Sequence, residues 1–201
     1  MDRLLALCGL LCVAAITPGP NNLVVLRAAG PAGVRGAMPA ILGIVLGGLL
    51  LLAAMMLGAG TVLASHPSLR QWIGVSGALY LVWLGMSLCA GGIRPLKTGA
   101  ASPDPTLPAG TLGLIGFQFL NPKSWVMVLT VLAALPPANA LRDYLPLAGL
   151  FVLIPTSCLL LWAALGTWLA RWLIRPTVRR STDIVMGALL VACAGLLLIE
   201  L

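Results

Sequence analysis

The first apolar run of this sequence, Leu4–Leu26, is interrupted by Thr17-Pro18-Gly19-Pro20-Asn21-Asn22. Each proline removes a backbone hydrogen bond and clashes with the preceding helical turn, so two prolines and a glycine do more than kink a helix. We therefore expect one half-helix to end here and another to begin at Pro20, with Gly19 supplying the turn. A structural kink in a packed bundle is the plainer alternative.

A second interruption, Asn121-Pro122-Lys123, lies inside the apolar run Leu112–Leu135. Asparagine suits the position that caps a helix N-terminus, and proline suits the first helical position. A lysine at the centre of a membrane span costs roughly 2.5–3.5 kcal/mol on insertion scales, and from there its side chain is too short to reach the interface. None of the five acidic residues lies well inside an apolar run to pair with it. Lys123 is therefore predicted to face a wet cavity or an anionic ligand, the alternative being a lysine neutralised by backbone carbonyls.

The composition places the whole chain in a membrane. Of its 201 residues, 60% are hydrophobic and only 8% are charged, whereas soluble chains are roughly a quarter charged. The basic residues are scattered between apolar runs, which excludes a nucleic-acid-binding protein. The chain has five acidic residues and one histidine, so few side chains could act as general acids or bases. We therefore predict that the protein is not an enzyme and has no catalytic residue and no bound cofactor or metal.

The apolar runs predict an all-α membrane protein with six transmembrane helices, because each run can cross about 30 Å of hydrocarbon as a helix. The six runs are Leu4–Leu26, Ala37–Leu63, Leu69–Ala90, Leu112–Leu135, Leu145–Leu173 and Thr182–Leu201. A cleaved signal peptide is the alternative for the first run, although the apolar sequence resumes after the break, which a signal peptide would not need.

A polar segment rich in proline and glycine, residues 91–110, divides the chain into a first repeat, 1–90, and a second repeat, 111–201. Three spans in each half would place the halves in opposite orientations, as in transporters built from inverted repeats, with helices one and four broken. Eight basic residues follow spans one, three and five, against three on the other side. The linker is therefore predicted to be cytoplasmic, and both termini to lie outside the cytoplasm.

In an inverted repeat, the half-helices that begin at Pro20 and Pro122 would approach the middle of the membrane from opposite sides. Their positive N-terminal ends and the ammonium of Lys123 would form a site for a carboxylate. Gln118, one turn before Asn121, could line the same cavity. The predicted substrate-binding residues are Thr17, Pro18, Gly19, Pro20, Asn21, Asn22, Gly47, Gln118, Asn121, Pro122 and Lys123.

The second span carries a stripe of small residues that includes Gly43 and Gly47. Such a stripe lets two helices approach closely. We expect it to pack against the broken first helix, or alternatively to form a homodimer interface.

Two other classes of membrane protein compete with a transporter. A redox or electron-transfer protein would need paired cysteines or clustered histidines, and the five cysteines form no Cys-x-x-Cys pair. A non-transporting membrane subunit would need neither two broken spans nor a central lysine.

The first break, followed by Gly33, Gly36, Gly43 and Gly47, resembles the lysine-exporter (LysE/RhtB) family of amino-acid translocators, and Asn121-Pro122-Lys123 is similar to that family's second-half motif. The resemblance covers nearly the whole chain. It implies a secondary transporter that exports amino acids or related small metabolites across the bacterial inner membrane, driven by the proton-motive force. Many relatives carry an acidic residue where this chain has Gly48. Its absence favours a neutral or apolar amino acid over a cationic one as substrate.

Overall fold

The computed structural model describes residues 2–93, 110–133, 145–173 and 175–199. Within these ranges every element is a helix, which confirms the all-α prediction. The elements are α1 (Asp2–Ile16), α2 (Pro20–Ala54), the π-helix η1 (Met55–Ala59), α3 (Gly60–Ser65), α4 (Pro67–Ile93), α5 (Gly110–Leu120), α6 (Pro122–Ala133), α7 (Leu145–Leu173) and α8 (Pro176–Ile199). Most of the predicted linker, residues 94–109, lies outside the described ranges.

Both predicted breaks are present. Helix α1 ends at Ile16 and α2 begins at Pro20, and the two segments are bent by 57° relative to each other. Gly19 precedes α2 with extended backbone angles. In the second half α5 ends at Leu120 and α6 begins at Pro122, so each half-helix starts on a proline, where its missing N–H costs nothing.

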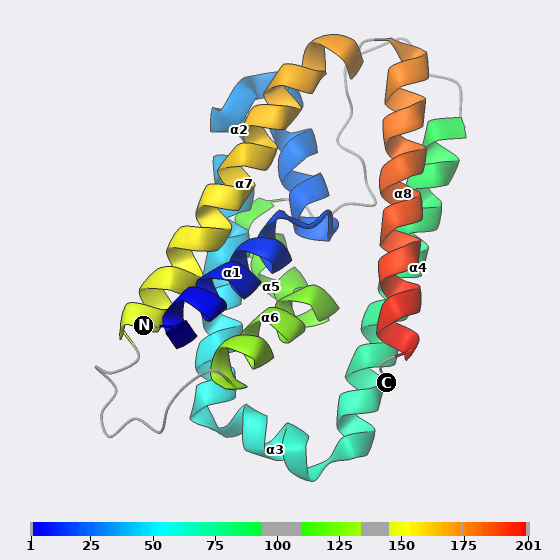
Figure 1. Cartoon of the computed structure of the whole chain (residues 1–201). Coiled ribbons are helices and arrows are strands. Elements are labelled where there is room, and N and C mark those ends of the chain that lie inside the picture. The colour runs from blue at the N-terminus through cyan, green and yellow to red at the C-terminus, as the bar shows by residue number, and fades with distance from the viewer. Residues whose placement is uncertain (1, 94–109, 134–144, 174, 200–201) are drawn as a thin grey trace.

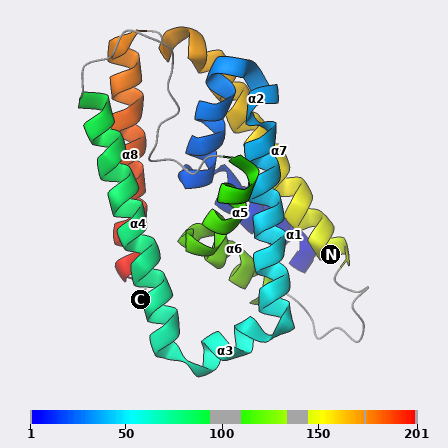
Figure 2. The same cartoon turned by 180° about the vertical axis from the view of Figure 1, so that it is seen from behind.

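Helix α2 changes direction at Gly33, which has a φ of 67°. Glycine adopts this left-handed conformation at little cost, whereas a side chain would strain it. The residues from Pro20 to Ala32 therefore form a half-helix, called here the lever, which leads into the long apolar part of α2. Gly58, with a φ of 118°, makes a second turn that leads into the short α3. In Figures 1 and 2, α3 crosses the lower end of the molecule towards α4.

Three described helices are long and apolar enough to cross a membrane: Ala32–Leu63, Pro67–Ala90 and Ala148–Trp172. The bent pair Leu5–Ile16 and Pro20–Gly30 makes a fourth span if its two parts cross together. These four correspond to the predicted spans two, three, five and one. The segments predicted as spans four and six, which contain α5–α6 and α8, are not among them, so the six-span arrangement stays a prediction.

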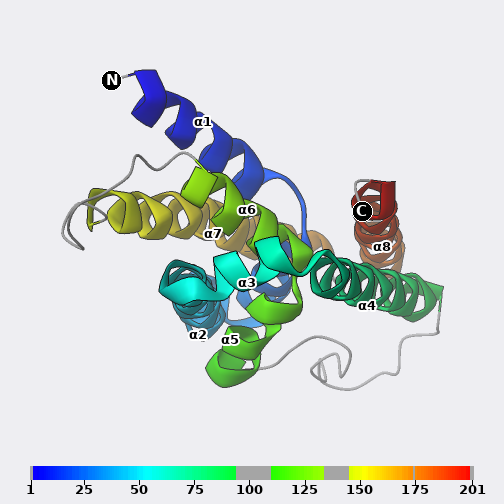
Figure 3. The ribbon, with the colours of Figure 1, turned by 90° about the horizontal axis from the view of Figure 1, so that it is seen from below.

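The helices pack as two groups. Helices α4 and α8 run side by side, while α1, α5 and α7 pack with α2 and α6 as a larger group, called here the main bundle. Figure 3 displays the α4–α8 pair on one side of that bundle. The core of the main bundle joins α2, α5 and α7 through buried residues such as Ile41, Phe117 and Leu159. Leu residues of α1, α2, α4 and α8 remain exposed on the outer faces, as expected of surfaces that contact lipid.

The glycine stripe of α2 packs against α5, so the prediction that it contacts the broken first helix is wrong. A Cβ atom on Gly43 would lie 2.6 Å from the carbonyl oxygen of Thr111, and one on Gly47 would lie 2.8 Å from that of Ile115. The two backbones approach so closely that only glycine fits. The prediction chose a neighbour that is close in sequence, whereas α5 lies far along the chain but beside α2 in the fold.

Several helix ends gather at one end of the molecule. The end of α4, the end of α7 and the start of α8 all lie at the upper end of Figure 1. At the end of α7, the guanidinium of Arg171 lies 5.2 Å from the ring centre of Trp168, and that of Arg175 lies 5.3 Å from Trp172. Aromatic and basic side chains of this kind are typical of a membrane–water interface.

Candidate functional site

The two breaks contact each other, although they lie about one hundred positions apart in the sequence. The ammonium of Lys123, at the second position of α6, donates a hydrogen bond to the backbone carbonyl of Thr17, just beyond the end of α1. A Cβ atom on Gly19 would lie 3.0 Å from Cδ and 3.1 Å from Nζ of Lys123. The absence of a side chain at Gly19 therefore lets the lysine lie against the first break.

A pair of amides links the breaks a second time. The Asn21 amide donates to Oε1 of Gln118 at 2.9 Å, and the Gln118 amide donates back to Oδ1 of Asn21 at 3.0 Å. The hydroxyl of Ser124 also donates to Oε1 of Gln118, at 2.7 Å. Gln118 is 1% exposed, so these bonds satisfy a polar group that would otherwise be costly to bury.

The carbonyl groups at the end of α1 are also satisfied. The Asn22 amide donates to the carbonyls of Ala15 at 3.1 Å and Thr17 at 2.7 Å. The indole N–H of Trp162, on α7, donates to the carbonyl of Ile16 at 3.2 Å. The end of a helix leaves such carbonyls without intrahelical partners, and inside a membrane protein other residues must supply them.

The two helix starts differ in their capping. Oδ1 of Asn121 accepts a hydrogen bond from the backbone N–H of Lys123 at 3.2 Å, so α6 has the predicted asparagine cap. Helix α2 follows Gly19 and has no side-chain cap. The backbone N–H groups of Asn21 and Asn22 at the start of α2 therefore lack the side-chain acceptor that α6 has, and the positive end of α2 is available to an anion.

Asn121 adds a second donor. Its side chain is fully buried, and its Nδ2 atom has no hydrogen-bond partner among the described residues. A buried amide without an acceptor costs about 1–3 kcal/mol, which makes this atom a place where a ligand oxygen would be stabilised.

The structure thus brings the predicted residues together from both halves of the chain. Pro18 lies in the non-helical segment between α1 and α2, and Pro20 and Pro122 begin the two half-helices. A Cβ atom on Gly47 would lie 2.6 Å from Cγ of Gln118, so Gly47 contacts the site through that side chain. Sequence reasoning missed Ser124 and Trp162. Ser124 follows Lys123 within one helical turn and could have been found, whereas nothing in the sequence ties Trp162 to Ile16.

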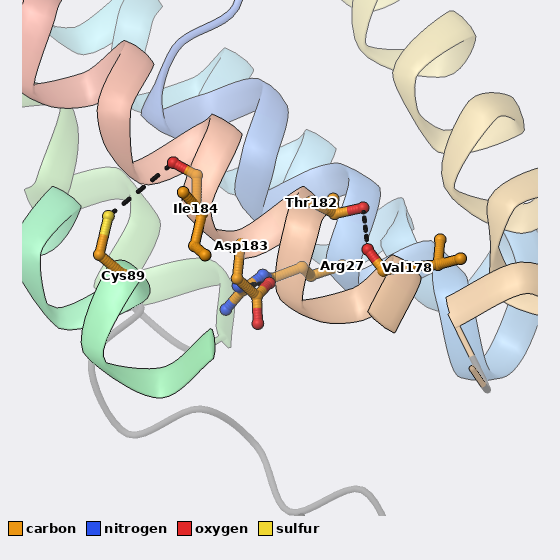
Figure 4. Close-up of polar contacts among 6 residues, drawn as sticks. All are labelled: Arg27, Cys89, Val178, Thr182, Asp183 and Ile184. Carbon is orange, nitrogen blue, oxygen red and sulfur yellow. Dashed lines mark hydrogen bonds and ion pairs between the residues drawn. The ribbon is translucent and has the colours of Figure 1, made fainter. Parts of the chain in front are cut away.

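Charge is distributed unevenly around the site. Within the described part of the chain, Lys123 has no carboxylate within salt-bridge distance; the ion pair there joins Arg27 and Asp183 at 2.5 Å (Figure 4). An ammonium has three N–H donors, and the bond to Thr17 uses one of them. A half-buried cation, an uncapped helix N-terminus and an unpartnered amide donor together form a site suited to a small anion or carboxylate.

An apolar helical bundle with two broken helices that meet at a lysine has the construction of a multi-pass membrane transporter. Comparison with known families agrees with this class: the model of the family described as "LysE type translocator" matches residues 12–201. This chain belongs to the LysE type translocator family.

Individual relatives extend the comparison. The chain is 30% identical over 187 residues to the cysteine/O-acetylserine efflux proteins of Salmonella choleraesuis strain SC-B67, Salmonella typhimurium strain LT2 and Escherichia coli O6:H1 strain CFT073. Each match covers 90% of this chain and 90% of the relative. No solved structure matches the chain.

Proposed function

We propose that this protein exports small neutral amino acids, of the size of cysteine or O-acetylserine, from the bacterial cytoplasm across the inner membrane. The matched relatives are named as efflux proteins for these two compounds and share almost the full length of the chain. Gly48 supports a neutral substrate, because it leaves the second span without an acidic residue to attract a cationic side chain.

The observation that carries the proposal is the contact between Lys123 and the carbonyl of Thr17. An α-amino acid is a zwitterion, with an anionic carboxylate and a cationic ammonium bonded to the same carbon atom. It can enter by separating these two groups. The substrate carboxylate then binds the lysine ammonium and the N-terminal end of α2. The substrate ammonium donates a hydrogen bond to the carbonyl oxygen of Thr17 that the lysine has released.

The unpartnered amide of Asn121 gives this arrangement a further donor for the carboxylate. The Asn21–Gln118 pair holds the two breaks in register while the lysine moves, since it joins α2 to α5 independently of Lys123. All eleven sequence-predicted residues then act either as ligands or as the frame that positions the ligands.

The wider architecture belongs to the same proposal. Two inverted repeats, residues 1–90 and 111–201, each provide three spans and one broken helix, and the linker 91–110 lies in the cytoplasm with both termini outside. Cross-packing of the halves supports this, because α2 packs along α5 and α7, and α4 packs along α8. The proton-motive force drives export, and the apolar outer faces contact membrane lipid.

The test is efflux from proteoliposomes loaded with labelled cysteine, O-acetylserine or lysine. Wild-type protein should release the two neutral compounds and not lysine, and an uncoupler should abolish release against a gradient while leaving exchange of internal for external substrate. Lys123→Ala and Lys123→Met should reduce efflux at least tenfold, because a charge-assisted hydrogen bond contributes roughly 1.5–3 kcal/mol.

The matched control is Lys97→Met, which changes the other lysine of the chain, in the linker, and should export normally. Size-exclusion profiles in detergent would verify that all variants fold. Full efflux by Lys123→Ala would refute the role given to the lysine, and no efflux of any amino acid by wild-type protein would refute the proposed function itself.

A further inference from the structure

The α4–α8 pair is tightly joined within itself. A Cβ atom on Gly85 would lie 2.6 Å from the carbonyl oxygen of Gly187, and one on Gly187 would lie 2.5 Å from that of Gly85. This close approach lets the two helix backbones pack directly against each other, and buried leucines such as Leu84 and Leu190 fill the contact around it. The pair is therefore suited to move as one body against the main bundle.

One face of the lever connects the main bundle to this pair. Leu23 is 1% exposed and packs in the α4–α8 core, although its neighbours Val24 and Val25 belong to the core of the main bundle. Arg27 lies four residues further along and therefore on the same helix face as Leu23. Its guanidinium lies 2.5 Å from Oδ1 of Asp183 on α8, as Figure 4 shows.

The position of this ion pair couples movement of α8 to movement of the lever at the candidate site. The lever begins at the site, where Asn21 and Asn22 contact the two breaks, and ends at the Gly33 turn. Arg27 lies between these points. A movement of α8 away from the lever must therefore break the ion pair, and a shift of the lever that releases the substrate is transmitted to Arg27 through a single rigid helix.

The side chains of Arg27 and Asp183 are 22% and 12% exposed, so the pair lies at the edge of the packed interface and not on the free surface. A pair in this place is screened little by salt, so its attraction draws α8 towards the lever. The ion pair therefore adds to the apolar contact of Leu23 in favouring the closed arrangement of the two bodies.

We propose that Arg27 and Asp183 are positioning residues of the transport cycle: their ion pair closes the predicted cytoplasmic side of the protein between the α4–α8 pair and the main bundle, and it opens to admit substrate. This inference rests on the proposed transport function. It adds to that function a named gate, outside the residues that hold the substrate.

Accessibility of the site tests the gate without requiring transport. Ser124→Cys, in a background without native cysteines, places a small thiol in the buried site. Asp183→Asn should raise its rate of labelling by a maleimide added from the cytoplasmic side at least fivefold. The reversed pair Arg27→Asp with Asp183→Arg should return labelling towards the rate of the unmodified gate, which a merely structural defect would not do.

The control for these substitutions is Arg35→Gln, because Arg35 lies just beyond the lever on α2 and is exposed. Its labelling rate should equal that of the parent protein. Equal labelling of the Asp183→Asn and parent proteins, or failure of the reversed pair to restore slow labelling, would overturn the gate.

Crosslinking supplies the second test. Arg27→Cys with Asp183→Cys, joined by a short bifunctional methanethiosulfonate reagent, should lose at least nine-tenths of its efflux and regain it on reduction. The control joins Cys89 to Ile184→Cys, since Sγ of Cys89 lies 3.8 Å from the carbonyl of Ile184 at the same level but within the α4–α8 pair (Figure 4). That crosslink should leave efflux unchanged.

Undiminished efflux after the first crosslink would exclude an opening between these bodies. If the uncrosslinked protein exports no amino acid at all, the proposed function is wrong. The labelling experiment still tests the gate in that case, because it measures access to the site and not transport.

Discussion

The contact of α2 with α5 allows a prediction whose size can be worked out from the structure. A Cβ atom at Gly47 would lie 2.6 Å from Cγ of Gln118, 2.8 Å from the carbonyl oxygen of Ile115 and 2.9 Å from its Cα. The Gln118 side chain can turn away, but the Ile115 atoms belong to the backbone of α5. Ordinary contact begins near 3.4 Å, so Gly47→Ala must separate the helices by about 0.6 Å at this point.

Overpacking of this kind costs about 1–3 kcal/mol, and the better helix propensity of alanine returns up to about 1 kcal/mol. We therefore expect Gly47→Ala to lower the melting temperature in detergent by roughly 2–8 °C. Efflux should fall on the order of 10- to 100-fold, because Gln118, which joins the two breaks, is displaced.

Two other glycines provide a graded control. Gly116→Ala, on α5, meets nothing within 4 Å and should keep or slightly raise stability. Gly48→Ala meets the ring of Phe151 at 3.2 Å, a side chain that can turn, and should have an intermediate effect. Wild-type melting and efflux in Gly47→Ala would refute the close approach of α2 to α5. Equal losses in all three variants would mean that the backbone contact is not the cause.

Three further outcomes are expected. Gly166→Ala would place a Cβ atom 2.2 Å from the carbonyl oxygen of Leu26, so it should prevent α2 from packing on α7 and reduce the yield of folded protein in detergent more than Gly47→Ala does. Asn22→Leu removes both bonds to the end of α1 and should lower stability by about 1–3 kcal/mol, measured by chemical unfolding, because the buried carbonyl of Ala15 and the part-buried carbonyl of Thr17 each lose a donor. A cysteine at Ser102 should be labelled by an impermeant reagent in inverted vesicles and not in intact cells, and the reverse pattern would place the linker outside the cytoplasm.

Much of the candidate site was predictable because it depends on local backbone chemistry. Pro20 and Pro122 begin helices, Asn121 caps one of them, and Gly19 leaves room at the break, all for reasons confined to a few neighbouring residues. The depth of Lys123 in an apolar run marked it as a residue in need of a partner. The partner itself was not predictable, because any carbonyl or ligand oxygen would have met the same need.

The sequence alone determined that this is a helical membrane protein, where its helices break, and which residues stand at the breaks. These properties follow from composition and from backbone rules that act over one or two turns. Only the tertiary structure decided that the glycine stripe packs on α5, that Asn21 meets Gln118 across 97 positions, and that Arg27 pairs with Asp183 across 156. In an apolar chain nearly every helix face can pack against lipid or against another helix, so hydrophobic pattern cannot select the partner. Close fit between particular backbones selects it, and that fit exists only once the helices have assembled.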